Sequence, residues 1–464
     1  MVVAALAFAP AAHAGGPSLL IGATEDAVRS PDIVTAKAQM DLIKLAGFQA
    51  VRITQIWSPG QTTLSPEDTT VLNNVVGAAQ LDGIQVFASV LNATAKTTPL
   101  TAQDQADFAA YAASIVSTVP GITHLIVGNE PNLNLYWLPQ FDPNGGDAAA
   151  TAYESLLATT YDAVKAVAPK VMVLGGAVSP RGNDQPNGTR LTHSPSTFIP
   201  DLGAAYRASG RATPIMDGFA FHPYEDNSSI APVNGVNPKS TSVMIADYHK
   251  LVGLLSDAFD GTDQPGSTLP IYYDEFGVQS QIPPDKAAEY TGTEQSTTKP
   301  VDELTQGEYY TQAIQIAFCS PTVAGFFIFH SVDETALTGW QSGLYYPDLT
   351  PKASLPAVEL AIKEAKRGVV ARCPGLELMP KAKASQHGSR LALSCDIDCS
   401  YVAQLYLLPR RLLITRRGRV VGGRPGTLPI RAPTVAGLYR LRVTFWASVN
   451  PGRPKMIQLP VTAR

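Results

Sequence analysis

The sequence of 464 residues is poor in cysteine, with four residues, and in charge, with 16% Asp, Glu, Lys and Arg. Its 45% of hydrophobic residues describes a globular protein with a large core, and neither a disordered chain nor an array of membrane helices. No glycine-rich loop follows the first expected strand, so nucleotide binding is unsupported. No cysteine pair has C-x-x-C spacing and no histidine cluster accompanies the cysteines, which argues against a metal site. The sequence predicts no cofactor, no metal and no nucleic-acid partner.

The formal net charge of -4 hides an uneven distribution along the chain. Residues 376–464 contain 15 Lys and Arg against 3 Asp and Glu, a balance of +12, which leaves -16 for the residues before them. Two bodies of opposite charge predict two domains. The chain is also long enough for a barrel of ordinary size and one further domain.

The first 14 residues form an apolar stretch that ends in Ala12-His13-Ala14, the small-x-small pattern of a secretory cleavage site. This stretch is too short to span a bilayer, and it lacks the basic region with which such leaders usually begin. We expect a signal peptide over residues 1–14, a mature chain that begins near Gly15, and a secreted or extracytoplasmic protein without a transmembrane segment.

Eight apolar runs alternate with amphipathic stretches over residues 15–375. The expected strands are residues 19–21, 50–54, 84–90, 125–128, 171–174, 218–221, 271–273 and 325–329. Helical patterns fall between them, as at residues 36–45, 103–116, 152–167, 242–259 and 307–318, and residues 354–368 read as a closing helix. Because a doubly wound sheet usually stops sooner, eight alternations predict a (β/α)₈ barrel, the TIM-barrel fold.

After the closing helix the periodicity changes to short alternating segments separated by Gly and Pro. These segments are residues 390–394, 401–408, 412–415, 440–446 and 456–461. The pattern predicts that residues 376–464 form a small all-β, sandwich-like domain. Its excess of positive charge favours attraction to an anionic cell-wall polymer, although an arginine-rich surface can also simply be solvated.

An even number of cysteines fits an oxidising compartment. Cys395 and Cys399 are close enough in sequence to clip a tight turn, and Cys319 and Cys373 are placed to join two late barrel helices. We therefore expect two disulfides, Cys319 with Cys373 and Cys395 with Cys399.

Two carboxylate motifs follow apolar runs. Glu130 ends His124-Leu-Ile-Val-Gly-Asn-Glu130, after the fourth run, and Glu275 ends Pro270-Ile-Tyr-Tyr-Asp-Glu275, at the seventh. Parallel barrel strands direct their carboxyl ends to one face, where barrel enzymes carry their active sites. Glycosidic bond cleavage needs one carboxyl to protonate the leaving oxygen and a second on the other side of the sugar. The alternative is that both glutamates cap strands through surface hydrogen bonds.

With these motifs the chain resembles the clan A retaining glycoside hydrolases, cellulase-like barrels such as those of families 5 and 39. The resemblance covers roughly residues 19–368 and none of the tail. It implies that Glu130 is the acid/base, that Asn129 binds the substrate 2-hydroxyl and that Glu275 is the nucleophile. A retaining enzyme holds its two carboxyls about 5 to 5.5 Å apart.

Three further positions follow the resemblance. His222 and Tyr224, after the sixth run, are similar to the residues that orient the nucleophile in cellulase-like members. Arg52, on the second run, looks like the buried arginine that keeps the nucleophile ionised. A histidine beside an apolar strand can equally be a core residue, and an arginine at a strand end can pair with a structural carboxylate.

Sugar binding needs flat apolar surfaces, and Trp57, Tyr136, Trp137 and Trp340 lie in segments where they could supply them or could instead pack in the core. Many clan members end strand eight in tryptophan, whereas this chain has Phe329-His330. His330 is therefore a candidate for substrate contact, and the identity of the sugar stays open.

Two other classes compete with a glycosidase. A catalytically inactive barrel that binds carbohydrate or the cell wall would keep its aromatic residues but typically lose a carboxylate, and both are present. A metal-dependent barrel hydrolase usually has His-x-His on its first strand, and residues 19–24 contain no histidine. The expected partner is a carbohydrate substrate; linkage, exo or endo action and oligomeric state stay open.

Overall fold

The structure is a computed structural model that describes residues 15–235, 239–368, 370, 380–384, 390–395, 399–409, 411–420, 426–430, 438–447 and 454–462. The chain divides into two compact units. One consists of Leu20–Ala317 and Gly325–Lys363, and the other includes the C-terminal part from Glu364 onward.

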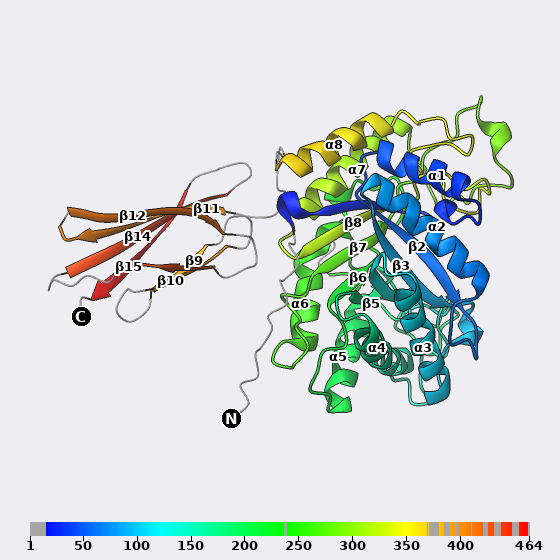
Figure 1. Ribbon diagram of the computed structural model, residues 1–464, viewed down its shortest axis with the longest axis horizontal. Helices are drawn as coiled ribbons and strands as arrows, with labels where there is room; N and C mark the ends of the chain where they lie inside the picture. The colour runs from blue at the N-terminus through cyan, green and yellow to red at the C-terminus, as the bar shows by residue number, and fades with distance from the viewer. Residues whose placement is uncertain are drawn as a thin grey trace. The chain divides into compact units, whose positions relative to one another are not determined.

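The first unit is built on a closed barrel of parallel strands in the order β1 to β8, which confirms the predicted fold (Figure 1). The strands are β1 (Leu20–Thr24), β2 (Ala50–Trp57), β3 (Gln85–Asn92), β4 (Ile122–Val127), β5 (Met172–Val178), β6 (Gly218–Phe221), β7 (Ile271–Phe276) and β8 (Val323–Phe329). The ring closes where β1 pairs with β8, with Leu20 opposite Gly325. Most of their residues are buried because barrel strands are covered by helices outside and by packed side chains inside.

Helices connect the strands, as Figure 1 shows. They are α1 (Ile33–Leu45), α2 (Pro66–Asp82), α3 (Ala102–Thr118), α4 (Ala148–Val167), α5 (Pro195–Ser209), α6 (Tyr248–Phe259), α7 (Glu303–Phe318) and α8 (Leu355–Arg367). The ends of α2 follow local rules: the Ser65 side chain accepts from the Asp68 amide, Pro66 is the first helical residue, and Gly83 ends the helix in the left-handed region.

One expected helix begins later than predicted. Residues 242–259 read as a single helix, but α6 begins at Tyr248 and is preceded by a short 3₁₀ turn at Ile245–Asp247. The Asp247 side chain accepts from the Met244 amide, and Lys250 Nζ donates to the Ser242 carbonyl. These bonds satisfy the backbone in a turn instead of in a helix.

The C-terminal part contains antiparallel sheets, as expected for an all-β domain. A three-stranded sheet has the order β13 (Gly426–Pro429), β10 (Arg390–Ser394), β9 (Lys381–Ala384). A four-stranded sheet has the order β12 (Arg411–Val420), β11 (Cys399–Leu407), β14 (Leu438–Ala447), β15 (Lys455–Thr462). Buried residues of both sheets form a separate core that includes Leu391, Tyr401, Leu441, Val443 and Phe445.

The predicted Cys395–Cys399 disulfide is present, with 6.4 Å between the Cα atoms. Cys319 is also disulfide-bonded. Its predicted partner, Cys373, lies outside the described residues, so that pairing stays a prediction.

Over the described ranges, no helix has both the length and the hydropathy required to cross a bilayer. The leader predicted at residues 1–14 lies outside the described residues. Export therefore stays a prediction.

Candidate active site

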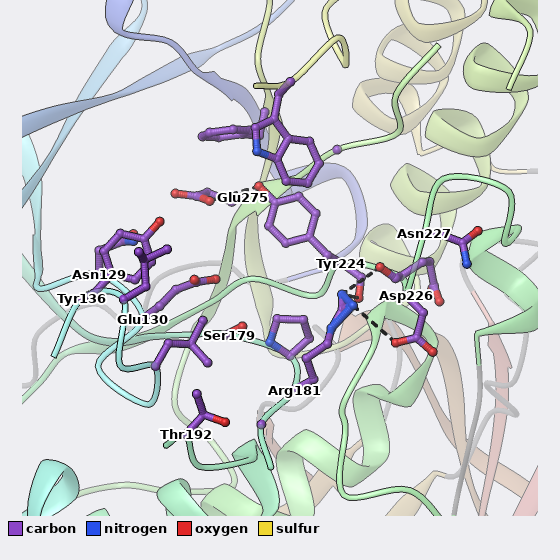
Figure 2. Close-up of a pocket in the computed structure, with 18 of the residues that line it drawn as sticks. Asn129, Glu130, Tyr136, Ser179, Arg181, Thr192, Tyr224, Asp226, Asn227 and Glu275 are labelled. Carbon is purple, nitrogen blue, oxygen red and sulfur yellow. Dashed lines mark hydrogen bonds and ion pairs between the residues drawn. The ribbon is translucent and has the colours of Figure 1, made fainter. Parts of the chain in front are cut away.

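A cavity of about 1130 Å³ opens at the carboxyl ends of the barrel strands. The residues that line it include Arg52, Asn129, Glu130, Tyr136, Arg181, Tyr224, Glu275, His330 and Trp340. Figure 2 shows Glu130 and Glu275 beside this cavity, with Tyr136 and Tyr224 close to them. The chain thus brings both motif carboxylates to one pocket.

Glu130 follows β4 in a sharply turned segment. Gly128 has φ 79° and Glu130 has φ 40°, both in the left-handed region. A side chain on Gly128 would meet Tyr153 Cε2 at 3.2 Å, so glycine is favoured by both backbone and space. The Glu130 amide donates to the Ala177 carbonyl at 2.8 Å, which ties the turn to β5. These constraints fix where the Glu130 carboxylate enters the pocket.

Glu275 lies inside β7, one residue before its end. Its Oε1 accepts from Arg52 Nη1 at 2.7 Å, and its Oε2 accepts from the Tyr224 hydroxyl at 3.0 Å. Arg52, on β2, is only 2% exposed. Its Nη2 also donates to Ser89 Oγ at 3.1 Å and to Asn129 Oδ1 at 3.3 Å. Arg52 therefore fixes Glu275 and orients the amide of Asn129.

His222 lies between the two glutamates and is fully buried. Its Nδ1 is 3.0 Å from Glu130 Oε1 and 3.5 Å from Glu275 Oε2, so these oxygens are no more than 6.5 Å apart, the sum of the two distances. Burial opposes a charged ring, but the nearby carboxylates of Glu275, Asp274 and Glu130 raise the pKa of His222 to about 10. The ring is therefore an imidazolium at neutral pH.

Asp274 is a buried carboxylate that the sequence motifs did not single out. Its Oδ2 is 3.2 Å from Arg52 Nε and 3.4 Å from His222 Nε2, as ion pairs without hydrogen-bond geometry. The sequence did contain a signal for this contact. Arg52, His222 and Asp274 are three charged side chains in or beside apolar strands, and because buried charges require partners, they could have been predicted to pair with one another. Asp274 thus links the two cations that contact Glu275.

Tyr136 and Tyr224 also line the cavity. Burial, together with the charges of Glu275 and Glu130, raises the pKa of both phenols, so both stay protonated. Tyr136 was expected only as a candidate aromatic surface, and its backbone carbonyl accepts from Asn92 Nδ2 at 2.9 Å.

Trp340 and His330, both expected as candidates for substrate contact, line the cavity. Trp340 lines the cavity, with its ring centroid 4.9 Å from that of Tyr224 and 5.5 Å from that of Phe329. His330 also lines it, and its Nδ1 is 2.8 Å from the Thr24 carbonyl oxygen.

Trp57 and Trp137 do not line the cavity. Trp57 is fully buried edge-on against Phe108 of α3, at 5.5 Å between centroids, so its side chain points outward to the helix layer. Trp137 is 1% exposed and packs against Tyr153 of α4 at 5.7 Å. The structure places both in the core, the alternative that sequence alone left open.

The cavity is also lined by a cation that sequence reasoning missed, Arg181. Arg181 donates to the Glu225 carbonyl at 2.8 Å and pairs with Asp226 at 3.3 Å, as the dashed lines in Figure 2 show.

Within the described part of the chain, no group of three or more His, Cys, Asp or Glu side chains could hold a metal ion.

No protein-family model matches the chain, and no curated protein matches it. Its fold is similar to solved structures of glycoside hydrolases. A GH5_18 variant from Streptomyces cattleya in complex with Manβ1-4GlcNAc is 16% identical, with a TM-score of 0.51 over 75% of this chain and 80% of that one. A glucosidase from Croceicoccus marinus is 11% identical, with a TM-score of 0.51 over 90% and 94% of the two chains.

The exo-β-1,4-mannosidase of Opitutaceae bacterium strain TAV5 is 16% identical, with a TM-score of 0.50 over 78% of this chain and 63% of that one. The chain spans 45% of the length of β-glucuronidase 2 from Bacteroides uniformis, to which it is 10% identical with a TM-score of 0.48. At these identities the likeness shows a shared barrel.

Proposed function

We propose that this protein is a secreted, retaining glycoside hydrolase that cleaves a β-linked oligo- or polysaccharide. The observation that supports this most directly is that Glu130 and Glu275 both contact Nδ1 of His222, so that Glu130 Oε1 and Glu275 Oε2 are no more than 6.5 Å apart. Carboxyls are about 5 to 5.5 Å apart in retaining enzymes and about 6.5 to 9.5 Å apart in inverting ones, which leave room for a water. We propose a β-linkage by analogy with the exo-β-1,4-mannosidase whose fold is similar.

In the proposed mechanism, Glu275 attacks the anomeric carbon while Glu130 protonates the leaving oxygen. Arg52 and Tyr224 each bind one oxygen of Glu275, and these two hydrogen bonds hold its carboxyl group in a fixed orientation. The glycosyl–enzyme bond is then broken by a water from which Glu130 removes a proton, so the configuration is retained. Asn129, held by Arg52, is assigned to the 2-hydroxyl, and Trp340 offers an apolar ring to a sugar face.

The test uses purified protein and a panel of aryl glycosides and polysaccharides. Proton NMR of the first product formed distinguishes retention from inversion. Glu275→Ala should abolish turnover of every substrate, whereas Glu130→Ala should spare substrates with good leaving groups, which need little protonation in the first step. The exposed Glu359→Gln on α8 is the control and should keep full activity. Inverted product from the unmodified protein would contradict the retaining assignment.

Azide separates the roles of the two carboxylates. Added to Glu130→Ala, it should attack the glycosyl intermediate and give a glycosyl azide with the configuration of the substrate. Added to Glu275→Ala, it should replace the nucleophile and give the inverted azide from an activated glycoside. Equal products from both variants would show that the assigned roles are wrong.

A further inference from the structure

The four-stranded sheet of the C-terminal part has one face in the core and one face outside it. On β11, Tyr401, Ala403 and Leu405 are buried, and on β14, Leu441, Val443 and Phe445 are buried. Because side chains alternate along a strand, the residues between these point to the opposite, outer face. The registers β12·β11 and β11·β14 extend this assignment across the sheet.

Four arginines and two aromatic residues occupy this outer face. Arg417 and Arg419 of β12 stand opposite Val402 and Ser400, and Arg440 and Arg442 alternate with buried residues of β14. Tyr406 pairs with Arg440, and Trp446 lies in one row with Ser400 and Arg419. We call these six residues the arginine face: Arg417, Arg419, Arg440, Arg442, Tyr406 and Trp446.

Among the residues of the C-terminal part that the structure describes, these charges have no acidic counterpart. None of the described residues between 380 and 462 is Asp or Glu. The guanidinium carbon of Arg442 lies 5.2 Å from the centre of the Tyr406 ring, which fits a cation–π contact and holds a cation flat against the sheet. A cluster of like charge attracts an anionic partner.

Protection of a sheet edge against pairing with another chain explains only two of the four arginines, Arg417 and Arg419. Arginines on an edge strand such as β12 prevent pairing with another chain. Arg440 and Arg442, however, lie on β14, which is hydrogen-bonded on both sides, by β11 and by β15. Their position on an interior strand needs another explanation, and a ligand that lies across the sheet supplies one.

We propose that the arginine face binds an acidic polysaccharide, a chain of sugars with carboxylate groups. Strands β12 and β14 are two steps apart, about 10 Å, and alternate residues along a strand are about 7 Å apart, so the cations are spread over more than one sugar unit. Partly buried Tyr406 and Trp446 add ring surfaces of the kind on which sugars pack. The choice of a polysaccharide over another polyanion rests on the proposed glycosidase function.

The test measures binding of the full-length protein to polygalacturonate by affinity gel electrophoresis. We expect retardation at about 20 mM salt that is lost at about 0.5 M salt, since exposed charges are screened. Arg417→Gln/Arg419→Gln and Arg440→Gln/Arg442→Gln should each raise the dissociation constant about three- to tenfold. Tyr406→Ala should weaken binding without changing net charge.

The matched control is Lys381→Gln/Lys383→Gln, which removes the same charge from two exposed positions on β9 of the three-stranded sheet. It should change the dissociation constant less than either arginine pair. An equal effect of the lysine and arginine pairs, or no binding by the unmodified protein at low salt, would overturn the proposal. Equal binding to polyglutamate or duplex DNA would overturn the assignment to a polysaccharide. Because the assay needs no turnover, its outcome is independent of the catalytic test.

Discussion

Asp274 does not line the cavity, yet it pairs with both cations that hold the proposed nucleophile. Removing its charge by Asp274→Asn should let Arg52 and His222 shift, because each loses an ion-pair partner. A displacement of this kind lowers kcat by about tenfold to hundredfold. We also expect the pKa of His222 to fall, since the Asp274 charge contributes to raising it.

Two measurements separate positioning from a general loss of stability. Because His222 contacts both proposed catalytic glutamates, we expect loss of its proton to reduce kcat at high pH, so the alkaline limb of the kcat profile should move to lower pH in Asp274→Asn. In Asp217→Asn, which removes a carboxylate that pairs with Lys165 at the start of the barrel strands, the profile should stay in place. An unchanged profile in Asp274→Asn would refute the positioning role.

His222 predicts a pH dependence of stability. Its pKa is about 10 in the folded protein, above the value of about 6.5 in an unfolded chain. A raised folded-state pKa contributes stability that is complete below the unfolded pKa and is lost as pH rises through the folded pKa. The difference in free energy of unfolding between the wild type and His222→Asn should therefore shrink between about pH 6.5 and pH 10. Urea unfolding across this range measures it, and a constant difference would mean that the ring is neutral.

Sequence reasoning found the residues of the pocket whose chemistry is visible in short motifs. Glu130, Asn129, Glu275, Arg52 and Tyr224 line it, and His222 lies buried beside it in contact with both glutamates. It did not single out Asp274, because adjacent carboxylates in one motif cannot be told apart from sequence alone, and the catalytic role fits Glu275 by its resemblance to the clan A enzymes. It could not place Trp57 and Trp137, because a tryptophan after a strand fits the core and a pocket equally well.

At the scale of elements, the turn after β4 tests how backbone shape positions chemistry. Gly128→Ala places a β-carbon in the left-handed region and 3.2 Å from Tyr153 Cε2. The left-handed conformation alone costs about 1–2 kcal/mol for a residue with a β-carbon. We expect this loss of stability, and also a lower kcat, because relief of the contact moves Glu130.

Gly83, which ends α2, is a matched control. It has φ 68°, close to the 79° of Gly128, but a β-carbon added there would have no neighbour within 4 Å. Gly83→Ala should cost a similar free energy of unfolding and leave kcat unchanged. Equal kcat in both variants would show that the turn does not position Glu130.

The strand pattern predicted the barrel because eight buried strands give eight continuous apolar runs. Their ends were less certain: β7 continues to Phe276, so Glu275 lies within the strand and not after it. In the tail, the short strands β9 and β13 were not foreseen. Four residues of alternating exposure, such as Lys381–Ala384, carry too little pattern to be told from a loop.

At the scale of the whole molecule, the separate hydrophobic core and the opposite net charge of the C-terminal part predict that this part is not needed for the hydrolysis of small substrates. The C-terminal part has its own hydrophobic core, and the barrel is closed by pairing of β1 with β8. A chain that ends at residue 375 keeps every residue of the pocket and retains Cys373 for its predicted bond with Cys319. We expect unchanged kcat/KM on an aryl glycoside and loss of retardation by polygalacturonate. If the truncated chain still unfolds cooperatively on heating but has a lower kcat/KM than the full-length protein, the tail supports catalysis itself.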